Sequence, residues 1–191
     1  MLRRTMRKRT LSGRLIGQGW IAGAAMALMI TLSLFDPLHD PLTQHMSESI
    51  EGSWWLALAI RILPGIMGAS ITLFGLGCLG QSRGWSWSGL AALLFGAAMI
   101  ANGIFPAGNP LHGLHGLAIF SVLVPAFYVA EYRTSRSIKQ LSLAASFIAL
   151  LYMWVLLVGL EPPEYRGVTQ RAASLVSFGW FAVLAFSRKR N

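Results

Sequence analysis

The segment LIGQGWIAGAAMALMITLSLF, residues 15–35, decides the fold class, because it is a run of 21 residues without a charged side chain. That length is enough for one helix to cross the hydrocarbon core of a bilayer. The preceding segment, MLRRTMRKRTLSGR, carries six basic residues and no acidic one. A signal peptide has a shorter apolar region and a small-residue cleavage site, and no such site follows Phe35. We therefore expect a retained first transmembrane helix.

Composition and further apolar runs extend this prediction to the whole chain. Of its 191 residues, 54% are hydrophobic and only 12% are charged, whereas soluble domains average about a quarter charged. Six spans are expected at about residues 15–35, 54–79, 85–105, 111–130, 141–160 and 168–186. The sequence thus predicts an all-α integral membrane protein. Its six-transmembrane-helix bundle covers residues 15–187, between a basic segment at 1–14 and a basic tail at 188–191.

The basic residues set the expected orientation. Thirteen of the sixteen Lys and Arg residues fall in the two terminal segments and in the loops after spans two and four. Six of the seven acidic residues fall on the opposite side. Since short cytoplasmic loops are enriched in Lys and Arg, we expect a protein of the bacterial plasma (inner) membrane with both termini in the cytoplasm. The net charge of +9 then favours contact with anionic lipid, and we expect no nucleic-acid partner.

The opposite, extracytoplasmic side carries all four histidines, and two of them, His112 and His115, lie in the turn FPAGNPLHGLHG, residues 105–116. In a helix, residues three apart share one face, so both imidazoles could approach one metal ion together with a carboxylate from another loop. Asn109 and Pro110 offer a simpler explanation, in which they begin the fourth span and both histidines face the membrane interface. Proton transfer or binding of a polar ligand is a third alternative.

Two arginines lie near span ends on the same side. Arg61 is seven residues into the second span, where a charge is costly unless it meets a partner, and Glu48 and Glu51 are candidate partners. Arg171, at the start of the sixth span, either snorkels to the interface or points inward to the loop at residues 36–53. The sharper alternative for both is to clamp a lipid phosphate. The candidate ligand-binding residues are Arg61, Arg171, Asp36, Asp40 and Asn109.

Motifs of known enzymes are missing from the sequence. It holds no nucleotide-binding loop, no nucleophile elbow and no zinc-protease helix. Hydrolysis stays an alternative through the candidate catalytic residues His112, His115, Glu48 and Ser47, of which the two histidines are also candidate metal ligands. No span carries a mid-membrane Asp or Glu, which argues against proton-driven transport. We expect no cofactor, and whether the chain is an enzyme stays open.

Packing positions can also be predicted, because helix contacts in a membrane favour small residues. The expected contact positions of spans two and three are Gly65, Gly68, Gly75, Gly77, Gly96, Ala97 and Gly103. Five tryptophans are expected mostly at the membrane interface: Trp54, Trp55, Trp85, Trp87 and Trp180. The lone Cys78 is expected to be a small buried hydrophobe.

Three segments together resemble a known family: FDPLHDPLTQHMSESIEGSWW before the second span, GIFPAGNPLHGLHG between the third and fourth, and GVTQRAASLVSFGW at the sixth. In this order they are similar to the bacterial six-helix membrane family known as domain of unknown function 998, over about residues 13–186. In this chain the family pattern singles out Asp36, Asp40, Ser47, Glu48, Phe105, Pro106, His112, His115 and Arg171. The chain departs from the pattern at Gly108, where the family has an acidic residue. The resemblance implies that the outer polar residues belong together, and it implies no reaction.

These observations favour a lipid-interacting or accessory membrane protein with a polar pocket on its extracytoplasmic face. A membrane-embedded hydrolase, metal-assisted through the outer histidines and carboxylates, is the alternative, and a small transporter is the third. The expected partners are membrane lipids, with a second copy of the chain or other membrane proteins as further alternatives.

Overall fold

The computed structural model describes residues 11–82, 84–105, 107–114 and 116–189, and every regular element in these ranges is helical. Residues 11–17 form a helical segment that continues, after a turn, into α2 (Trp20–Phe35). The remaining α-helices are α3 (Trp54–Gln81), α4 (Trp87–Ile104), α5 (Phe120–Glu131), α6 (Arg136–Leu157) and α7 (Arg166–Lys189). Three short 3-10 helices are η1 (Met46–Glu51), η2 (His112–Leu114) and η3 (Leu117–Ile119). The all-α prediction is confirmed.

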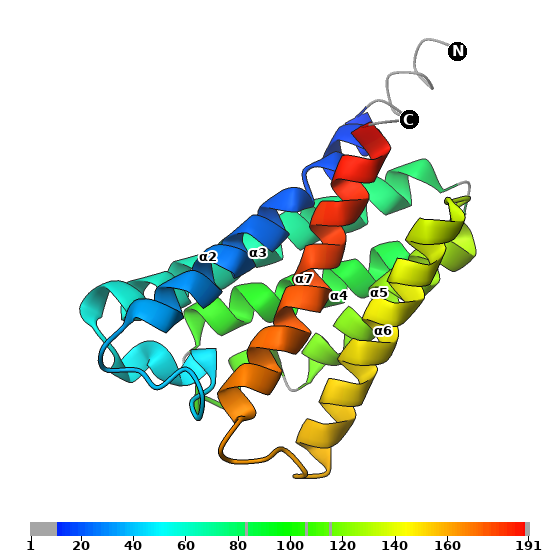
Figure 1. The fold of residues 1–191 in the computed structure, drawn as a ribbon. Coiled ribbons are helices and arrows are strands. Elements are labelled where there is room, and N and C mark those ends of the chain that lie inside the picture. Colours follow the sequence, from blue (N-terminus) through cyan, green and yellow to red (C-terminus); the bar gives the residue numbers. More distant parts are fainter. Residues whose placement is uncertain (1–10, 83, 106, 115, 190–191) are drawn as a thin grey trace.

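The helices α2 to α7 form a closed ring (Figure 1). Each packs against the next along the chain, as short connections favour, and α7 returns to pack against α2. The first described residues and the end of α7 lie at one end of the ring, which we call the terminal end (Figure 1). The other end, the loop end, is formed by residues 36–53, 107–114, 116–119 and 158–165.

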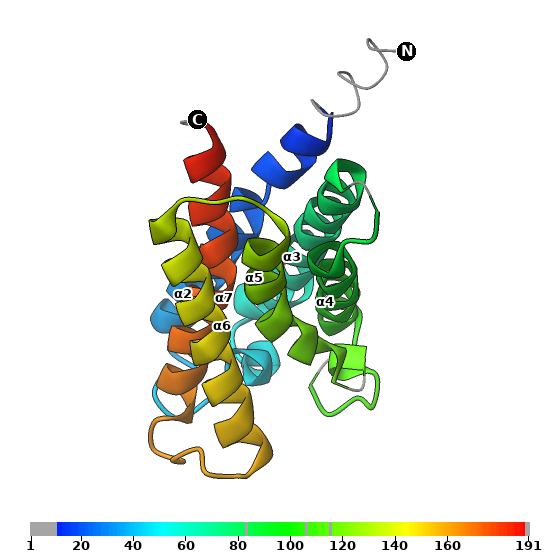
Figure 2. The ribbon, with the colours of Figure 1, turned by 90° about the vertical axis from the view of Figure 1, so that its right-hand side faces the viewer.

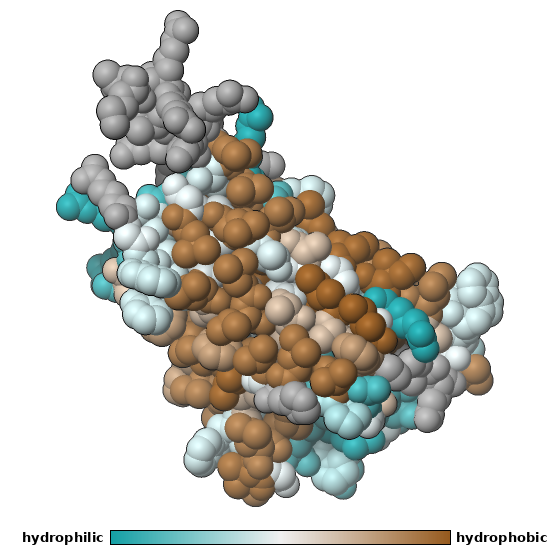
Figure 3. Space-filling model, turned by 180° about the vertical axis from the view of Figure 1, so that it is seen from behind, coloured by the Kyte–Doolittle hydropathy of each residue, from teal (hydrophilic) through white to brown (hydrophobic). Residues whose placement is uncertain are grey.

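The surface of the ring is that of a membrane protein. Four helical stretches of the described chain are long and apolar enough to cross a bilayer: Leu11–Phe35, α3, α4 and α6. Only 22–56% of their most apolar windows is buried within the protein, so much apolar surface faces outward. Hydrophobic side chains cover the middle of the face in Figure 3, and hydrophilic ones gather mainly toward its ends. Helix α5 is shorter, with 12 residues, and α7 has 24 residues but is less apolar.

Glycines bring α3 and α4 into close contact, as predicted for Gly68, Gly75, Gly96 and Gly103, whereas Gly77 meets Ser12 and Ile16 of the segment before α2. A Cβ atom added to Gly68 would lie 2.5 Å from the carbonyl oxygen of Gly96, and one on Gly75 would lie 2.8 Å from that of Gly89. A Cβ on Gly103 would likewise meet the α3 backbone at 2.5 Å. These glycines recur every seventh residue, so they form one seam along the two antiparallel helices.

Aromatic side chains fill the interior of the helix bundle toward its terminal end. Phe74, Tyr128, Trp180 and Phe181 are almost fully buried and contact one another at centroid distances of 4.9–5.9 Å. Trp180 donates from Nε1 to Ser142 Oγ at 2.7 Å. Trp180 is therefore a core residue, and its expected interfacial position is wrong. Of the other four tryptophans expected at the interface, Trp54, Trp85 and Trp87 are exposed.

The fourth span differs most from its prediction. A helix was expected from about residue 111, but α5 begins only at Phe120. Residues 107–114 and 116–119 instead form turns, η2 and η3. Leu114 and Gly116 have φ angles of 46° and 93°, which lie in the left-handed region and cannot continue an α-helix. The apolar composition of this segment predicted a helix, but the chain turns twice before α5.

Candidate functional site

Arg171 is the buried centre of the loop end. Its side chain reaches from α7 to the end of α2, where Nε and Nη2 donate to Ser33 Oγ at 3.2 and 3.1 Å. Nη2 also donates to His39 Nε2 at 2.8 Å. Because a guanidinium group has only donors, His39 must accept this hydrogen bond through an unprotonated Nε2. Arg171 is 7% exposed, so these contacts lie inside the protein.

The third nitrogen of Arg171 holds the loop at residues 36–53. Nη1 donates to the carbonyl oxygens of Pro41 at 2.9 Å, Gln44 at 3.0 Å and Gly167 at 2.8 Å. All three guanidinium nitrogens are thus occupied by protein acceptors. Arg171 points inward to the loop, as one of its predicted alternatives held, and it does not snorkel. Its donors are not available to a lipid phosphate, so the geometry does not support a clamp at this residue.

The charge of Arg171 affects the pKa of its neighbour His39. Burial lowers the pKa of His39, and the positive charge of Arg171 lowers it further. The carboxylates of Asp36, Glu48 and Asp40 act in the opposite direction without reversing the change. His39 is therefore neutral near pH 7, as its role as a hydrogen-bond acceptor requires.

Asp36 closes the base of the loop. It accepts hydrogen bonds from Leu38 N at 2.9 Å, Ser53 N at 2.8 Å and Ser53 Oγ at 2.9 Å, which joins the end of α2 to the residue before α3. Burial raises the pKa of Asp36, but these hydrogen bonds outweigh burial and lower it overall. The hydroxyl of Thr43, 2.6 Å from Asp40, lowers the pKa of that exposed carboxyl. Both aspartates thus serve the loop itself.

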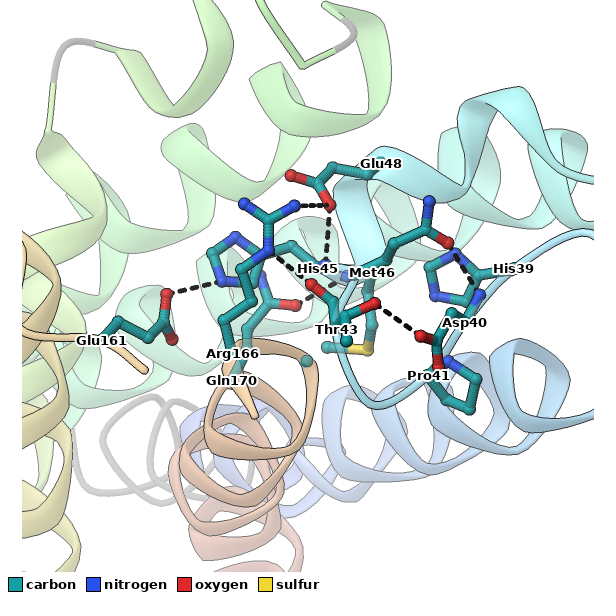
Figure 4. Close-up of polar contacts among 12 residues, drawn as sticks. His39, Asp40, Pro41, Thr43, His45, Met46, Glu48, Glu161, Arg166 and Gln170 are labelled. Carbon is teal, nitrogen blue, oxygen red and sulfur yellow. Dashed lines mark hydrogen bonds and ion pairs between the residues drawn. The ribbon is translucent and has the colours of Figure 1, made fainter. Parts of the chain in front are cut away.

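Two further residues of α7 bind the same loop. Arg166 lies between Glu48 and the carbonyl oxygen of Thr43 and donates to both, with 3.2 Å to Glu48 Oε2 (Figure 4). Gln170 accepts a hydrogen bond from Met46 N at 2.7 Å. The side chains of Arg166 and Glu48 are 42% and 35% exposed, so their ion pair is screened by solvent and contributes little stability. The buried contacts of Arg171 and Gln170 hold the loop against α7.

Gly167 lets the loop lie directly on α7. Its N–H donates to the carbonyl oxygen of Leu42 at 2.9 Å. A Cβ atom at this position would lie 2.5 Å from the carbonyl oxygens of both Pro41 and Gln44. Only glycine fits here without displacing the loop.

A second pair of polar residues joins the loop to the α6–α7 connection. His45 Nε2 lies 2.8 Å from Glu161 Oε2 (Figure 4). Thr169 donates to Glu161 Oε1 at 2.7 Å. This chain has the histidine–carboxylate contact of a catalytic triad. A triad also needs a nucleophile bonded to the histidine. Within the described ranges, no hydrogen bond joins Ser47 to His45 or to Glu48.

A cavity of about 360 Å³ lies within the ring, in its loop half. Polar residues line it toward the loop end: His45, Ser47, Asn102, His112 and Gln170. Mainly apolar residues line its deeper part, among them Met26, Met29, Ile60, Phe95, Met99, Met153 and Phe178. The cavity is therefore amphipathic, with a polar rim above an interior rich in methionine.

The short α5 explains why the cavity lies in this half. Helix α5 packs between α4 and α6, which have 18 and 22 residues against its 12 (Figure 2). Near the terminal end, α5 contributes Tyr128 to the aromatic core. Near the loop end, the described chain before Phe120 is not α-helical and contributes His112 and the short side chain of Ala118 to the cavity wall, and α5 adds Ser121.

Two side chains at the rim define its hydrogen bonding. His112 Nδ1 lies 2.8 Å from the carbonyl oxygen of Phe105, which only accepts, so Nδ1 donates this hydrogen bond. Asn102 Oδ1 is shielded from solvent and has no hydrogen-bond partner in the structure. Asn109 accepts from Leu111 N at 2.9 Å and so begins the turn before η2, where it had been expected to cap an α-helix.

The predicted site residues separate into distinct groups. Ser47 and His112 line the cavity. The residues that organise the loop are Asp36, Asp40, Glu48 and Arg171. Arg61 is exposed on α3 and belongs neither to the cavity lining nor to the contacts of the loop. Its expected partner Glu48 pairs with Arg166. His115 and Pro106 lie outside the described residues. No group of three or more His, Cys, Asp or Glu side chains in the described residues could hold a metal ion.

Sequence reasoning missed several residues of this end. Ser33 and Glu161 gave no signal, because one is a small residue inside an apolar run and the other lies in a proline-rich turn. Gly167 could be recognised only from its contact with the loop. Gln170 had a signal, since with Arg171 it forms a strongly polar pair at the start of a span.

Comparison with known proteins agrees with the resemblance in the loop motifs. The model of the family described as Protein of unknown function (DUF998) matches residues 17–187. No curated protein and no solved structure matches the chain. The match spans all six helices and both polar loops that form the cavity rim. The chain therefore belongs to the DUF998 family.

Proposed function

We propose that the protein binds a lipid-like amphiphile in the cavity at the loop end of its helix ring. In this proposal it is a multi-pass protein of the bacterial plasma membrane with both termini in the cytoplasm, and membrane lipids are its partners. The observation that carries the proposal is the cavity of about 360 Å³, a size within the usual range of small-molecule sites. It lies inside a bundle whose outer surface is apolar.

The two regions of the cavity match the two parts of an amphiphile. Met26, Met29 and Met99 line the deeper region, where flexible thioether side chains adapt to an acyl or isoprenoid chain. His112 and Gln170 lie at the polar rim, where a head group would find hydrogen-bond partners. The ligand would therefore bind with its chain pointing toward the middle of the bundle.

The rim also indicates the chemistry of the head group. No Lys or Arg is among the described residues that line the cavity, so nothing there would balance a phosphate. Asn102 Oδ1 is a buried acceptor without a donor, which is costly. A neutral head that donates hydrogen bonds, such as a hydroxyl or an amide, satisfies this atom.

Filling the cavity tests the proposal. Ala149 is 4% exposed on α6 and lines the cavity, whereas Ala144 on the same helix is exposed on the outer surface. Native mass spectrometry of the detergent-purified protein with added monooleoylglycerol would measure binding. We expect Ala149→Phe to reduce the bound fraction about tenfold, because its ring occupies the site, and Ala144→Phe to leave it unchanged.

Equal binding by wild type and Ala149→Phe would contradict the cavity as the binding site. The same conclusion would follow if Ala144→Phe lost as much binding, because the effect would then belong to the outer surface. The melting temperature of each variant shows whether the added ring unfolds the bundle. A smaller substitution, Ala149→Leu, provides a second and milder filling of the same space.

Hydrolysis finds less support than binding. Ser47 and His45 both line the cavity, but a nucleophile–base contact between them does not occur in the described structure. The metal-assisted form lacks a set of three ligands among the described residues. Binding needs only the cavity and its rim, so it is the function that the geometry supports best.

A further inference from the structure

A second cavity lies at the terminal end of the ring, away from the site of the proposed function. Its volume is about 310 Å³, and it is lined by the α5–α6 turn and the end of α7. The polar residues of its wall are Tyr132, Arg133, Thr134, Ser135, Ser187 and Arg188. Two cations and several hydroxyl groups therefore surround one space large enough for a small ligand.

Arg188 carries the strongest sign that this space takes a ligand. Its Nη2 donates to Gln81 Oε1 at 2.9 Å, which fixes the guanidinium group against α3. Its Nη1 is shielded from solvent and has no hydrogen-bond partner in the structure. A charged donor that has lost water and gained no acceptor is costly, so an acceptor bound in the cavity would stabilise it.

The carboxylates of the described residues do not fill this role. Glu131 lies at the end of α5, next in sequence to Tyr132 of this wall, but its oxygens accept from Ser88 Oγ at 2.6 Å, Ser86 Oγ at 2.9 Å and the Trp87 N–H. It thus caps the start of α4. Within the described ranges, no carboxylate pairs with Arg133 or Arg188. The charge of the cavity remains positive.

The hydroxyl groups add donors beside the two arginines. Ser135 Oγ accepts the N–H of Ile138 at the start of α6, which leaves its own proton to donate. Thr134 precedes it in the same wall. Guanidinium forks and hydroxyl donors together are the usual partners of phosphate oxygens.

We propose that this cavity binds a phosphate group, held by Arg188 Nη1, Arg133 and the hydroxyls of the α5–α6 turn. The group belongs either to an anionic lipid or to a soluble phosphate compound, and both would make the same contacts. The site is independent of the loop-end cavity, so either proposal can fail without the other. Its positive charge also separates it from that cavity, which has no described cation in its lining.

Native mass spectrometry with matched charge variants tests this site. The protein in a neutral detergent is titrated with dioleoyl phosphatidylglycerol, with phosphate-free dioleoylglycerol as the reference lipid. The variants are Arg188→Gln and Arg133→Gln, and the control is Arg136→Gln, an exposed arginine of the same turn region that does not line the cavity. We expect preference for phosphatidylglycerol, weakened about tenfold in both site variants and less than about twofold in the control.

Competition with inorganic phosphate identifies the source of the group. Displacement of phosphatidylglycerol by millimolar phosphate, sensitive to the same two variants, indicates a soluble phosphate ligand, and its failure indicates a lipid. Equal loss in all three variants would overturn the proposal, because a general positive field would then explain binding. No preference for the phosphate-bearing lipid in wild type would overturn it as well. Arg133 is exposed, so Arg133→Gln keeps the test decisive should Arg188→Gln not fold.

Discussion

At the scale of single residues, Arg171 decides the shape of the loop end. We expect Arg171→Gln to lower the free energy of unfolding by about 3 kcal/mol, because the buried carbonyls of Pro41 and Gln44 lose their donor. Arg166→Gln, which removes a half-exposed arginine bound to the same loop, should cost less than about 1 kcal/mol. Unfolding in detergent by increasing dodecyl sulfate, followed by tryptophan fluorescence, measures both. Equal losses would show that Arg171 is not the main anchor.

His39 gives the same end a dependence on pH. Burial and then Arg171 lower its pKa in the folded state below the usual 6.5, so the unfolded chain binds more protons once the pH falls below about 6.5. Stability should therefore be full above that pH and decline as the pH falls from 7 to 5. His39→Gln, whose amide oxygen can still accept from Arg171, should flatten the decline. Melting temperatures across this range decide, and an unchanged slope in the variant would contradict the assignment.

The carboxylates of the loop act in another pH range. The pKa values of Asp36 and Asp40 are lowered in the folded state, mainly by the hydrogen bonds that they accept. Their contribution to stability is present above their usual pKa of about 4 and is lost as the pH falls through the lowered values. The two effects are separated on the pH axis, so the part of the decline between pH 7 and 5 that His39→Gln removes reports on His39.

At the scale of helices, the glycine seam between α3 and α4 predicts opposite effects on stability for two Gly→Ala substitutions on α3. Gly68→Ala would place a Cβ 2.5 Å from a backbone oxygen of α4, so the helices must separate, at a cost of about 1–3 kcal/mol. Gly65→Ala lies three residues earlier on α3, and its Cβ would meet nothing within 4 Å. That change should stabilise the helix by up to about 1 kcal/mol. Opposite shifts of melting temperature confirm the seam, and two equal shifts contradict it.

The sequence predicted helices well where apolar length alone decides them. The second span was expected at 54–79, and α3 covers Trp54–Gln81. The prediction of a helix over 111–130 was wrong, because hydropathy contains no information on backbone angles. Gly116 permits a left-handed turn there, and the helix begins four residues later. Apolar composition is shared by a helix and by a buried irregular segment, so the short α5 and the cavity beside it could not be predicted.

The candidate site was predictable in part of its membership and not in its pairing. Charge counting placed the histidines and most acids on one side, and the structure gathers His45 and His112 around one cavity there. The contact of Arg171 with His39 joins residues 132 positions apart, and that of His45 with Glu161 joins residues 116 apart. Such pairs depend on how the ring closes, with α7 against α2. No spacing within the sequence encodes that closure.

At the scale of the whole molecule, the two ends of the ring differ in chemistry. The loop end holds a cavity with no Lys or Arg in its described lining, and the terminal end holds one lined by two arginines. If the basic end faces the cytoplasm, as the distribution of Lys and Arg predicts, each cavity opens toward a different leaflet. The orientation of the ring therefore decides which lipids each site meets.

Single cysteines at the two ends test this orientation. The native Cys78 is fully buried, so it should react little with a polar maleimide. Leu38 is 67% exposed at the loop end, and Ser137 is exposed at the start of α6, at the terminal end. We expect Leu38→Cys to be labelled by a membrane-impermeant maleimide on cells with a permeabilised outer envelope and an intact inner membrane. Ser137→Cys should be labelled only after the inner membrane is opened, because Lys- and Arg-rich segments remain in the cytoplasm. The reverse pattern would invert the assignment of both cavities to their leaflets.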